Sequence, residues 1–178
     1  MKENNRRLEQ YMRMYIIGSV GSGKTTLAKK AALAYRIPRF ETDNFVWERK
    51  PGGDARNSEE KRNKLFQEAV ELPEWVIEGV HIGWTDKGLE KADRIVFLDF
   101  PPRTRTWRII KRYIKQTLML EKANYRQTLR IFFKMFGWNR YFEETMKPEF
   151  LEKLQHYQAK TTIVKTQAEL QALKVENK

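Results

Sequence analysis

The stretch Ile16-Ile17-Gly18-Ser19-Val20-Gly21-Ser22-Gly23-Lys24-Thr25-Thr26 decides how this sequence folds. It contains the pattern G-x-x-x-x-G-K-[ST], in which glycines allow main-chain N–H groups to turn inward around an anion. An apolar run precedes the pattern, and a helix-forming run, Leu27 to Ala34, follows it. A helix that begins at such a loop directs its positive end at the same anion. The stretch therefore predicts a phosphate-binding loop between a buried strand and a helix.

The residue types in the loop predict which groups bind a nucleotide. Lys24 can reach the β- and γ-phosphates of a nucleoside triphosphate, and the Thr25 hydroxyl can bind the Mg²⁺ that bridges them. The other predicted nucleotide-binding residues act mainly through the main chain; they are Gly18, Ser19, Gly21, Ser22, Gly23 and Thr26. The alternative is a glycine-rich turn that matches by chance, and the flanking strand and helix argue against it.

Composition places further bounds on the protein. A chain of 178 residues fits one domain, 1–178, with a core that needs no metal or disulfide support. The absence of cysteine excludes disulfides and thiolate metal sites, and His81 and His156 are too few and too far apart in sequence to predict a metal site. No apolar signal core or membrane-length apolar run is present, so we expect a cytoplasmic protein with no membrane partner.

The positive charge is concentrated in one part of the chain. The formal net charge is +12, and residues 101–150 contain 12 Lys/Arg against 4 Asp/Glu, which is two thirds of the excess. Such a region could contact DNA or RNA, or close over ATP and a second anionic substrate. A solvated basic face without a partner is the third interpretation.

Short apolar runs alternate with helical patterns along the chain, which indicates an α/β protein with a mainly parallel sheet covered on both faces. The predicted strands are Arg13 to Ile17, Arg39 to Glu41, Trp75 to Ile77, Arg94 to Leu98 and Thr161 to Val164. Helices are expected at Glu59 to Val70 after a Ser58 cap, after Pro101-Pro102, at Glu149 to Gln158 and at Gln167 to Leu173.

Asp43 is the candidate catalytic base. It follows the second predicted strand, at the edge where open α/β sheets bind ligands. A carboxylate there could orient an acceptor hydroxyl and accept its proton, or it could only cap the turn. Residues 44–57 read as an excursion, with the substrate flap at about 44–72, in which Trp47 and Arg56 could contact a ring and an anionic group.

Two acids are candidates for supporting the metal. Glu78 follows the third predicted strand, and Asp99 follows the apolar run 95–98 in the pattern of a Walker B segment. Either carboxylate could hold the water shell of Mg²⁺, and the other could only cap its strand. The turn 165–167 faces the same edge and could border the nucleotide base.

Arg105, Arg108 and Arg112 form one stripe on the helix that follows Pro101-Pro102. Three guanidinium groups in a line can clamp a transferring phosphoryl group, which makes them candidate catalytic residues. They could instead face a nucleic-acid backbone or pair with the protein's own acids. The segment Leu118 to Phe142 is rich in aromatic residues, with Leu129, Phe132, Phe133 and Phe136 at helical spacing. This stripe predicts either core packing or a helical lid at about 105–145. In the lid, Gly137 would end the helix, and Trp138, Tyr141 and Phe142 would anchor the returning chain.

Four parts of the sequence together resemble one bacterial family. They are the loop, the segment 43–47, the segment Trp75-Val76-Ile77-Glu78-Gly79-Val80-His81 and the segment 105–112. It comprises the adenylate-kinase-related P-loop proteins that are often labelled DNA topology modulation proteins. The resemblance extends from about Arg13 to the end of the chain. It implies a three-layer P-loop NTPase fold of the nucleotide-kinase type, with a parallel sheet in the order 2-3-1-4-5, and ATP as the nucleotide.

The resemblance has one clear departure. Adenylate kinases resemble D-G-F-P-R where this chain reads Glu78-Gly79-Val80-His81-Ile82, so the arginine expected to hold a nucleoside monophosphate is missing. Two functional hypotheses follow. The first is an ATP- and Mg²⁺-dependent phosphotransferase acting on a small-molecule acceptor, whether a nucleoside, a nucleotide or a hydroxyl metabolite. The second is an ATP-binding, nucleic-acid-associated regulator of DNA topology.

Overall fold

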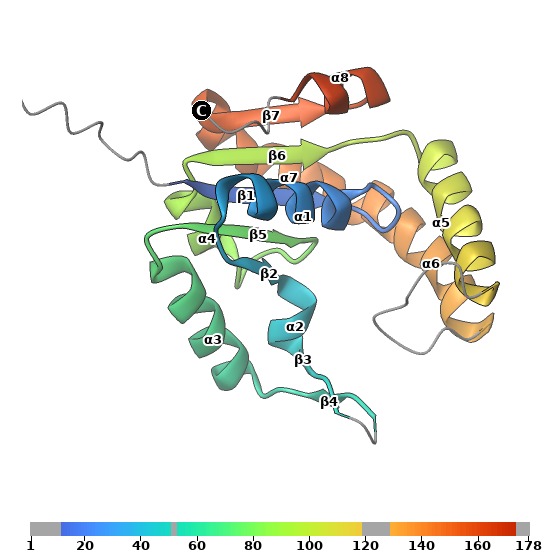
Figure 1. Ribbon diagram of the computed structural model, residues 1–178, viewed down its shortest axis with the longest axis horizontal. Coiled ribbons are helices and arrows are strands. Elements are labelled where there is room, and N and C mark those ends of the chain that lie inside the picture. The colour runs from blue at the N-terminus through green and yellow to red at the C-terminus, as the bar shows by residue number, and fades with distance from the viewer. Residues whose placement is uncertain (1–11, 51–52, 119–128, 174–178) are drawn as a thin grey trace, which may run out of the picture.

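A computed structural model describes residues 12–50, 53–118 and 129–173. Its central sheet has five parallel strands in the order β2-β5-β1-β6-β7 (Figure 1). These strands are β1 (Arg13–Gly18), β2 (Arg39–Glu41), β5 (Trp75–Gly79), β6 (Arg94–Leu98) and β7 (Thr161–Val164). The five predicted strands and their order are confirmed, and β1 and β5 extend one and two residues beyond the prediction.

Side chains alternate between the two faces of the sheet, and both faces are covered by helices. Met14 and Ile16 of β1 pack toward the first face, against α1 (Lys24–Tyr35) and Leu173, which directly follows α8 (Gln167–Ala172). Tyr15 and Ile17 of β1 pack toward the second face. That face is covered by α3 (Glu59–Glu71), α4 (Asp86–Lys91) and α7 (Lys147–Leu154). The result is the predicted three-layer architecture, with a separate core on each side of the sheet.

The segment after β2 is more regular than the sequence predicts. A short helix, α2 (Thr42–Val46), begins directly at the end of β2, and a small antiparallel pair follows it, β3 (Trp47–Glu48) with β4 (Ala55–Arg56). Ser58 then caps α3 as predicted, because its hydroxyl accepts a hydrogen bond from the main-chain N–H of Lys61 at 3.2 Å. Residues 51 and 52 of the predicted flap lie outside the described residues.

The segment after β6 forms two helices that lie side by side at one end of the sheet (Figure 1). They are α5 (Pro102–Thr117) and α6 (Leu129–Tyr141), and a π-helix, η1 (Phe142–Met146), joins α6 to α7. The α-helix of α7 ends four residues before the predicted end, and a 3₁₀ segment, η2 (Gln155–Lys160), leads into β7. Residues 119–128 of the predicted lid lie outside the described residues.

The prediction that Gly137 ends the aromatic helix is wrong. The helix continues through Gly137, which faces open space, because Met135 and Asn139 on either side of it are buried and hold the two turns in place. A single glycine inside a helix costs only about 1 kcal/mol relative to alanine, which such packing offsets. Trp138 and Tyr141, predicted as anchors, are exposed, and Phe142 alone of the three is buried.

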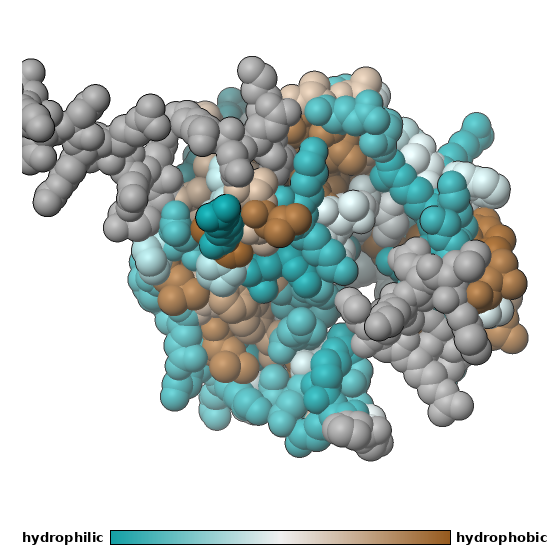
Figure 2. Space-filling model, viewed as in Figure 1, coloured by the Kyte–Doolittle hydropathy of each residue, from teal (hydrophilic) through white to brown (hydrophobic). Residues whose placement is uncertain are grey.

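The outer surface of α5 and α6 is hydrophobic as well as basic. Figure 2 shows hydrophobic residues gathered at the edge of the molecule where these helices lie. The large exposed apolar side chains on α5, at its end and on α6 are Trp107, Ile114, Leu118, Leu129, Phe133, Trp138 and Tyr141. The core-packing interpretation of the aromatic stripe is therefore wrong for Leu129 and Phe133. Phe132 and Phe136 are half-buried, and the Phe132 ring packs against Tyr113 of α5 at 4.3 Å. No helix among the described residues has the length and apolar character needed to cross a membrane.

Candidate nucleotide and acceptor site

The predicted phosphate-binding loop connects β1 to α1 at the carboxyl edge of the sheet. Gly21 and Gly23 adopt positive φ angles of 74° and 95°, which only glycine adopts without strain. Gly23 is also the residue at which α1 begins, and its carbonyl accepts a hydrogen bond from the N–H of Leu27 at 3.0 Å. A Cβ at Gly21 would lie 2.7 Å from the carbonyl oxygen of Arg105. The loop is therefore shaped by its glycines and held closely against α5.

Lys24 and Thr25, the first residues of α1, lie beside Glu78. Glu78 is buried on β5, and the desolvation raises the pKa of its carboxyl group. The positive charge of Lys24 and a hydrogen bond with the Thr25 side chain oppose this rise in pKa. Arg39 lies 3.4 Å from Glu78 and 2.6 Å from Glu41. A buried acid thus interacts with both the predicted lysine and the predicted magnesium ligand of the loop.

Asp99, the other candidate acid, has different neighbours. Its Oδ1 lies 2.7 Å from the Nζ of Lys147 in α7, and Lys147 also contacts Glu143 at 2.8 Å. The pKa of Lys147 is raised by hydrogen bonds to these two acids, against the opposing effect of burial. Asp99 therefore joins β6 to α7, whereas the contacts of Glu78 lead to the phosphate loop.

The described residues fit a magnesium ion that is bound mainly through phosphates. Among them, no three His, Asp or Glu side chains gather closely enough to hold a metal ion by themselves. Mg²⁺ in nucleotide enzymes commonly takes one or two protein ligands together with phosphate oxygens and water. A threonine hydroxyl at the start of α1 with a buried carboxylate behind it is compatible with that type of site.

Arg108 is the arginine of the predicted stripe that contacts the loop. Its Nη1 donates to the carbonyl oxygen of Ser22 at 2.9 Å, and its Nη2 donates to Oε1 of Gln167 at 2.9 Å. The guanidinium lies 4.0 Å from the centre of the Phe100 ring, and burial lowers the pKa of this group. Arg108 therefore joins the phosphate loop to the predicted base-bordering turn, where Thr166 caps α8.

The other two arginines of the stripe have separate partners. Arg105 is completely buried, forms an ion pair with Glu143 of η1 and stacks over the Phe142 ring at 5.2 Å. Arg112 directs Nη2 toward the Sδ atom of Met135 at 3.5 Å. Arg105 therefore pairs with one of the protein's own acids, which is one of the alternatives that the sequence leaves open for this stripe.

Asn139 contacts the loop although the sequence contains no signal for it. This buried residue of α6 accepts a hydrogen bond from the Ser19 hydroxyl at 3.3 Å, and its amide lies 3.4 Å from Oγ1 of Thr106. The partners are separated by 120 residues, and an asparagine in a basic helix resembles a surface residue until the fold places it. Helices α5 and α6 therefore both contact the phosphate loop.

Asp43 lies in the first turn of α2, directly after β2. Its side chain is 59% exposed, and Oδ1 lies 3.8 Å from Nε2 of His81. The other ring nitrogen of His81, Nδ1, lies 2.8 Å from the hydroxyl oxygen of Thr42. Burial lowers the pKa of His81, and the carboxylate of Asp43 opposes that shift. The predicted base therefore has a neighbouring imidazole that the sequence alone does not pair with it.

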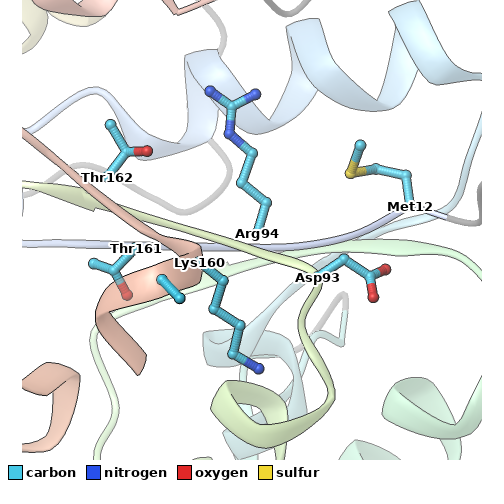
Figure 3. A pocket seen from close by; sticks show the side chains of 7 residues that line it. Met12, Asp93, Arg94, Lys160, Thr161 and Thr162 are labelled. Atoms are coloured by element: carbon cyan, nitrogen blue, oxygen red, sulfur yellow. The ribbon is translucent and has the colours of Figure 1, made fainter. Parts of the chain in front are cut away.

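A separate pocket lies at the amino ends of β6 and β7. It has a volume of about 310 Å³ and is lined by Met12, Asp93, Arg94, Ala159, Lys160, Thr161 and Thr162. Figure 3 shows the side chains of Arg94, on β6, and Lys160, at the end of η2, pointing in opposite directions. Asp93 accepts from the N–H of Arg13 at 2.8 Å, and Lys160 donates to two main-chain carbonyls at 2.7 Å. These polar groups lie at the amino ends of the strands, whereas the loop lies at their carboxyl ends.

The sequence matches no family model and no curated protein. Solved structures resemble it. Shikimate kinase from Acinetobacter baumannii in complex with shikimate is 18% identical, with a TM-score of 0.54 over 89% of this chain and 85% of that one. Shikimate kinase from Bacteroides thetaiotaomicron is 16% identical, with a TM-score of 0.44 over 86% and 85%. An unliganded sugar kinase from Janibacter is 14% identical, with a TM-score of 0.44 over 87% and 85%. The first of these likenesses shows that the chain has the P-loop NTPase fold of shikimate kinase.

Proposed function

We propose that this protein is an ATP- and Mg²⁺-dependent phosphotransferase that moves the γ-phosphate to a small-molecule acceptor. One observation carries the proposal: a glycine loop with Lys24 and Thr25 at its end is contacted by Arg108, and the exposed carboxylate of Asp43 follows β2 at the same carboxyl edge of the sheet. A phosphoryl transfer enzyme needs these parts, namely a phosphate cradle, cations for the transferring group and a residue that orients the nucleophile. The likeness to the P-loop kinase fold of shikimate kinase from Acinetobacter baumannii supports the same class of activity.

In this proposal the main chain of the loop binds the phosphates and the side chains stabilise charge. Lys24 and Arg108 face the negative charge of the transferring group, and Asp43 orients the acceptor hydroxyl and receives its proton. The new bond joins the acceptor oxygen to the γ-phosphorus, and the bond from that phosphorus to the bridging oxygen of ADP breaks. Arg105 acts through its ion pair with Glu143, which fixes α5 against η1, and its main-chain carbonyl lies close to Gly21 of the loop.

Thr25 and Glu78 are the residues that would hold the metal. When bound, Mg²⁺ neutralises charge on the β- and γ-phosphates. Thr25 would supply the hydroxyl ligand. The buried carboxylate of Glu78 would orient that hydroxyl and the water molecules bound to the metal. Asp99, with Lys147 at 2.7 Å, takes a structural role in this proposal.

An acceptor screen tests the proposal directly. The purified chain is incubated with MgATP and a panel of nucleosides, nucleotides, sugars and hydroxy acids, and ADP formation is measured for each. We expect acceptor-dependent ADP with the wild-type chain and a loss on the order of 10²-fold in Asp43→Asn, because a general base contributes that much or more. The matched control is Glu68→Gln, an exposed carboxylate-to-amide change on α3. Equal loss in both variants, or no acceptor-dependent product from the wild type, contradicts the proposal.

A second function has one observation in its favour. Helices α5 and α6 contain nine Lys/Arg residues and no acid, and exposed aromatic side chains lie among them. Single-stranded nucleic acids bind to surfaces of this kind, because phosphates contact the cations and bases stack on the rings. The measurement is affinity for a labelled single strand at several salt concentrations. Binding that weakens steeply with salt and stimulates ATP hydrolysis would favour the nucleic-acid-associated regulator.

A further inference from the structure

The contacts around His81 involve both nitrogens of its ring. Nδ1 lies 2.8 Å from the Thr42 hydroxyl, and Nε2 faces Oδ1 of Asp43 at 3.8 Å. Thr42 is completely buried, and it fits there because Gly79 has no side chain: a Cβ at Gly79 would lie 1.8 Å from Oγ1 of Thr42. The end of β5 and the start of α2 therefore fix the imidazole by its inner nitrogen, while its outer nitrogen faces the candidate base.

The Thr42 contact selects one tautomer of His81. Within the described part of the chain, the buried Thr42 hydroxyl has His81 Nδ1 as its hydrogen-bond partner. A buried hydroxyl proton needs an acceptor, so the hydroxyl donates to Nδ1. A neutral imidazole whose Nδ1 accepts carries its proton on Nε2. Nε2–H is therefore a donor that points toward the side of Asp43.

Burial favours the neutral form of the His81 ring. Burial lowers the pKa of His81, as do the positive charges of Arg62 on α3 and Lys24 on α1, while Asp43 on α2 opposes them. Trp84 packs against the ring at 5.1 Å and carries no charge. Arg62 lies 4.8 Å from the centre of the Trp84 ring. The outer nitrogen is thus presented as a neutral donor next to a carboxylate.

A separation of 3.8 Å between Nε2 and Oδ1 exceeds a direct hydrogen bond, but one oxygen atom can lie within hydrogen-bond distance of both. An alcohol suits this position, because its oxygen accepts from Nε2–H while its proton is donated to the carboxylate. A phosphate does not suit it, because its oxygens would meet the negative charge of Asp43 without a cation on the outer nitrogen.

We propose that His81 and Asp43 together bind the acceptor at the oxygen that is phosphorylated, and that this oxygen belongs to an alcohol rather than to a phosphate. The inference rests on the proposed phosphotransferase and names the class of its acceptor. His81 positions the oxygen, Asp43 receives the proton, and the oxygen attacks the γ-phosphorus as ADP leaves with the electron pair of the broken bond. The product is a phosphate ester.

The tautomer is measured without any substrate, by long-range ¹H–¹⁵N correlation in the full-length chain. The protein contains two histidines, so the variant His156→Gln, at an exposed position, assigns the remaining signal to His81. We expect the Nε2–H form in the wild type and a mixture of tautomers in Thr42→Val, which keeps the shape of the side chain and removes the hydroxyl. An Nδ1–H form in the wild type overturns the proposal, whether or not the chain proves to be a kinase.

The acceptor class is measured on the products of the screen with ³¹P NMR. A phosphate ester on an alcohol supports the proposal, and a phosphoanhydride, such as a nucleoside diphosphate formed from a monophosphate, overturns it. His81→Asn removes the outer donor and should lower kcat by about tenfold, as expected for one hydrogen bond, with ATP affinity unchanged. His81→Gln can place an amide N–H near the position of Nε2 and should restore most of that loss. Equal loss in both variants with intact folding contradicts the positioning role.

Discussion

The phosphate loop and the helix that covers it, α5, differ in what determines their chemistry. The loop contains its groups within a short contiguous stretch, and most of them are main-chain N–H groups directed by glycine dihedral angles. On α5, by contrast, three arginines at regular helical spacing have three different partners: Glu143, the carbonyl of Ser22 with Gln167, and Met135. Local sequence is enough to predict a main-chain site. A side-chain site depends on partners that only the tertiary fold supplies.

The largest effect that tests this comparison is expected in the loop. Lys24→Ala should reduce phosphoryl transfer on the order of 10³-fold, because the lysine charge at the transferring group has no substitute in the loop. Steady-state kinetics gives the loss, and calorimetry with MgATP shows whether binding persists. Lys30→Ala, an exposed position on the same helix, is the matched control and should change neither quantity. An unaffected Lys24→Ala variant would show that the loop does not contact the transferring group.

The next largest effect is expected in the stability of the protein. Arg105→Ala removes a fully buried guanidinium and leaves Glu143 with only Lys147, so we expect a loss of about 3 kcal/mol in the free energy of unfolding. Urea denaturation measures this change, and Arg103→Ala at an exposed position of α5 should alter it by less than about 0.5 kcal/mol. An Arg105→Ala variant with an unchanged free energy of unfolding and a lower kcat would instead mean that Arg105 binds the transferring phosphoryl group.

Arg108→Ala should have a smaller effect, and it should act on turnover rather than on stability. The guanidinium is partly exposed and contacts the carbonyl of Ser22, so its loss removes one charge near the transferring group. We expect kcat to fall roughly 10- to 100-fold with a much smaller change in ATP affinity. Arg108→Lys keeps the charge and removes the paired donors, so it separates charge from geometry. Equal losses in kcat and in ATP affinity would contradict a role in the transition state.

The same difference explains how much of the fold the sequence predicts. The strands are identified from residues 13–17, 39–41, 75–77, 94–98 and 161–164 because each is a short run with apolar residues that ends at a polar or glycine residue. The order of the sheet comes from the resemblance, since no local pattern specifies which strands pair. The end of α6 is missed because burial of Met135 and Asn139 overrides the local preference of Gly137.

The candidate site divides in the same way. The loop residues are predicted from spacing alone, and Asp43 is predicted because the carboxyl ends of parallel strands meet at one edge. The contact of His81 with Thr42 and that of Asn139 with Ser19 join residues 39 and 120 positions apart, and nothing in either segment predicts its partner. Glu78 and Asp99 look equivalent in sequence, and only their neighbours, Thr25 and Lys147, separate them.

The smallest effect is expected for Arg112, and it sharpens the comparison most. The contact of its guanidinium with Met135 involves a weak sulfur acceptor at 3.5 Å, and the pair supports only the packing of α5 on α6. Arg112→Ala should therefore change kcat less than twofold and the free energy of unfolding by less than about 1 kcal/mol. Steady-state kinetics and urea denaturation measure both. A tenfold loss of kcat with unchanged stability would mean that α5 moves during turnover and brings Arg112 to the phosphates. In the present arrangement, Arg108 is the arginine of this stripe that contacts the loop through its side chain.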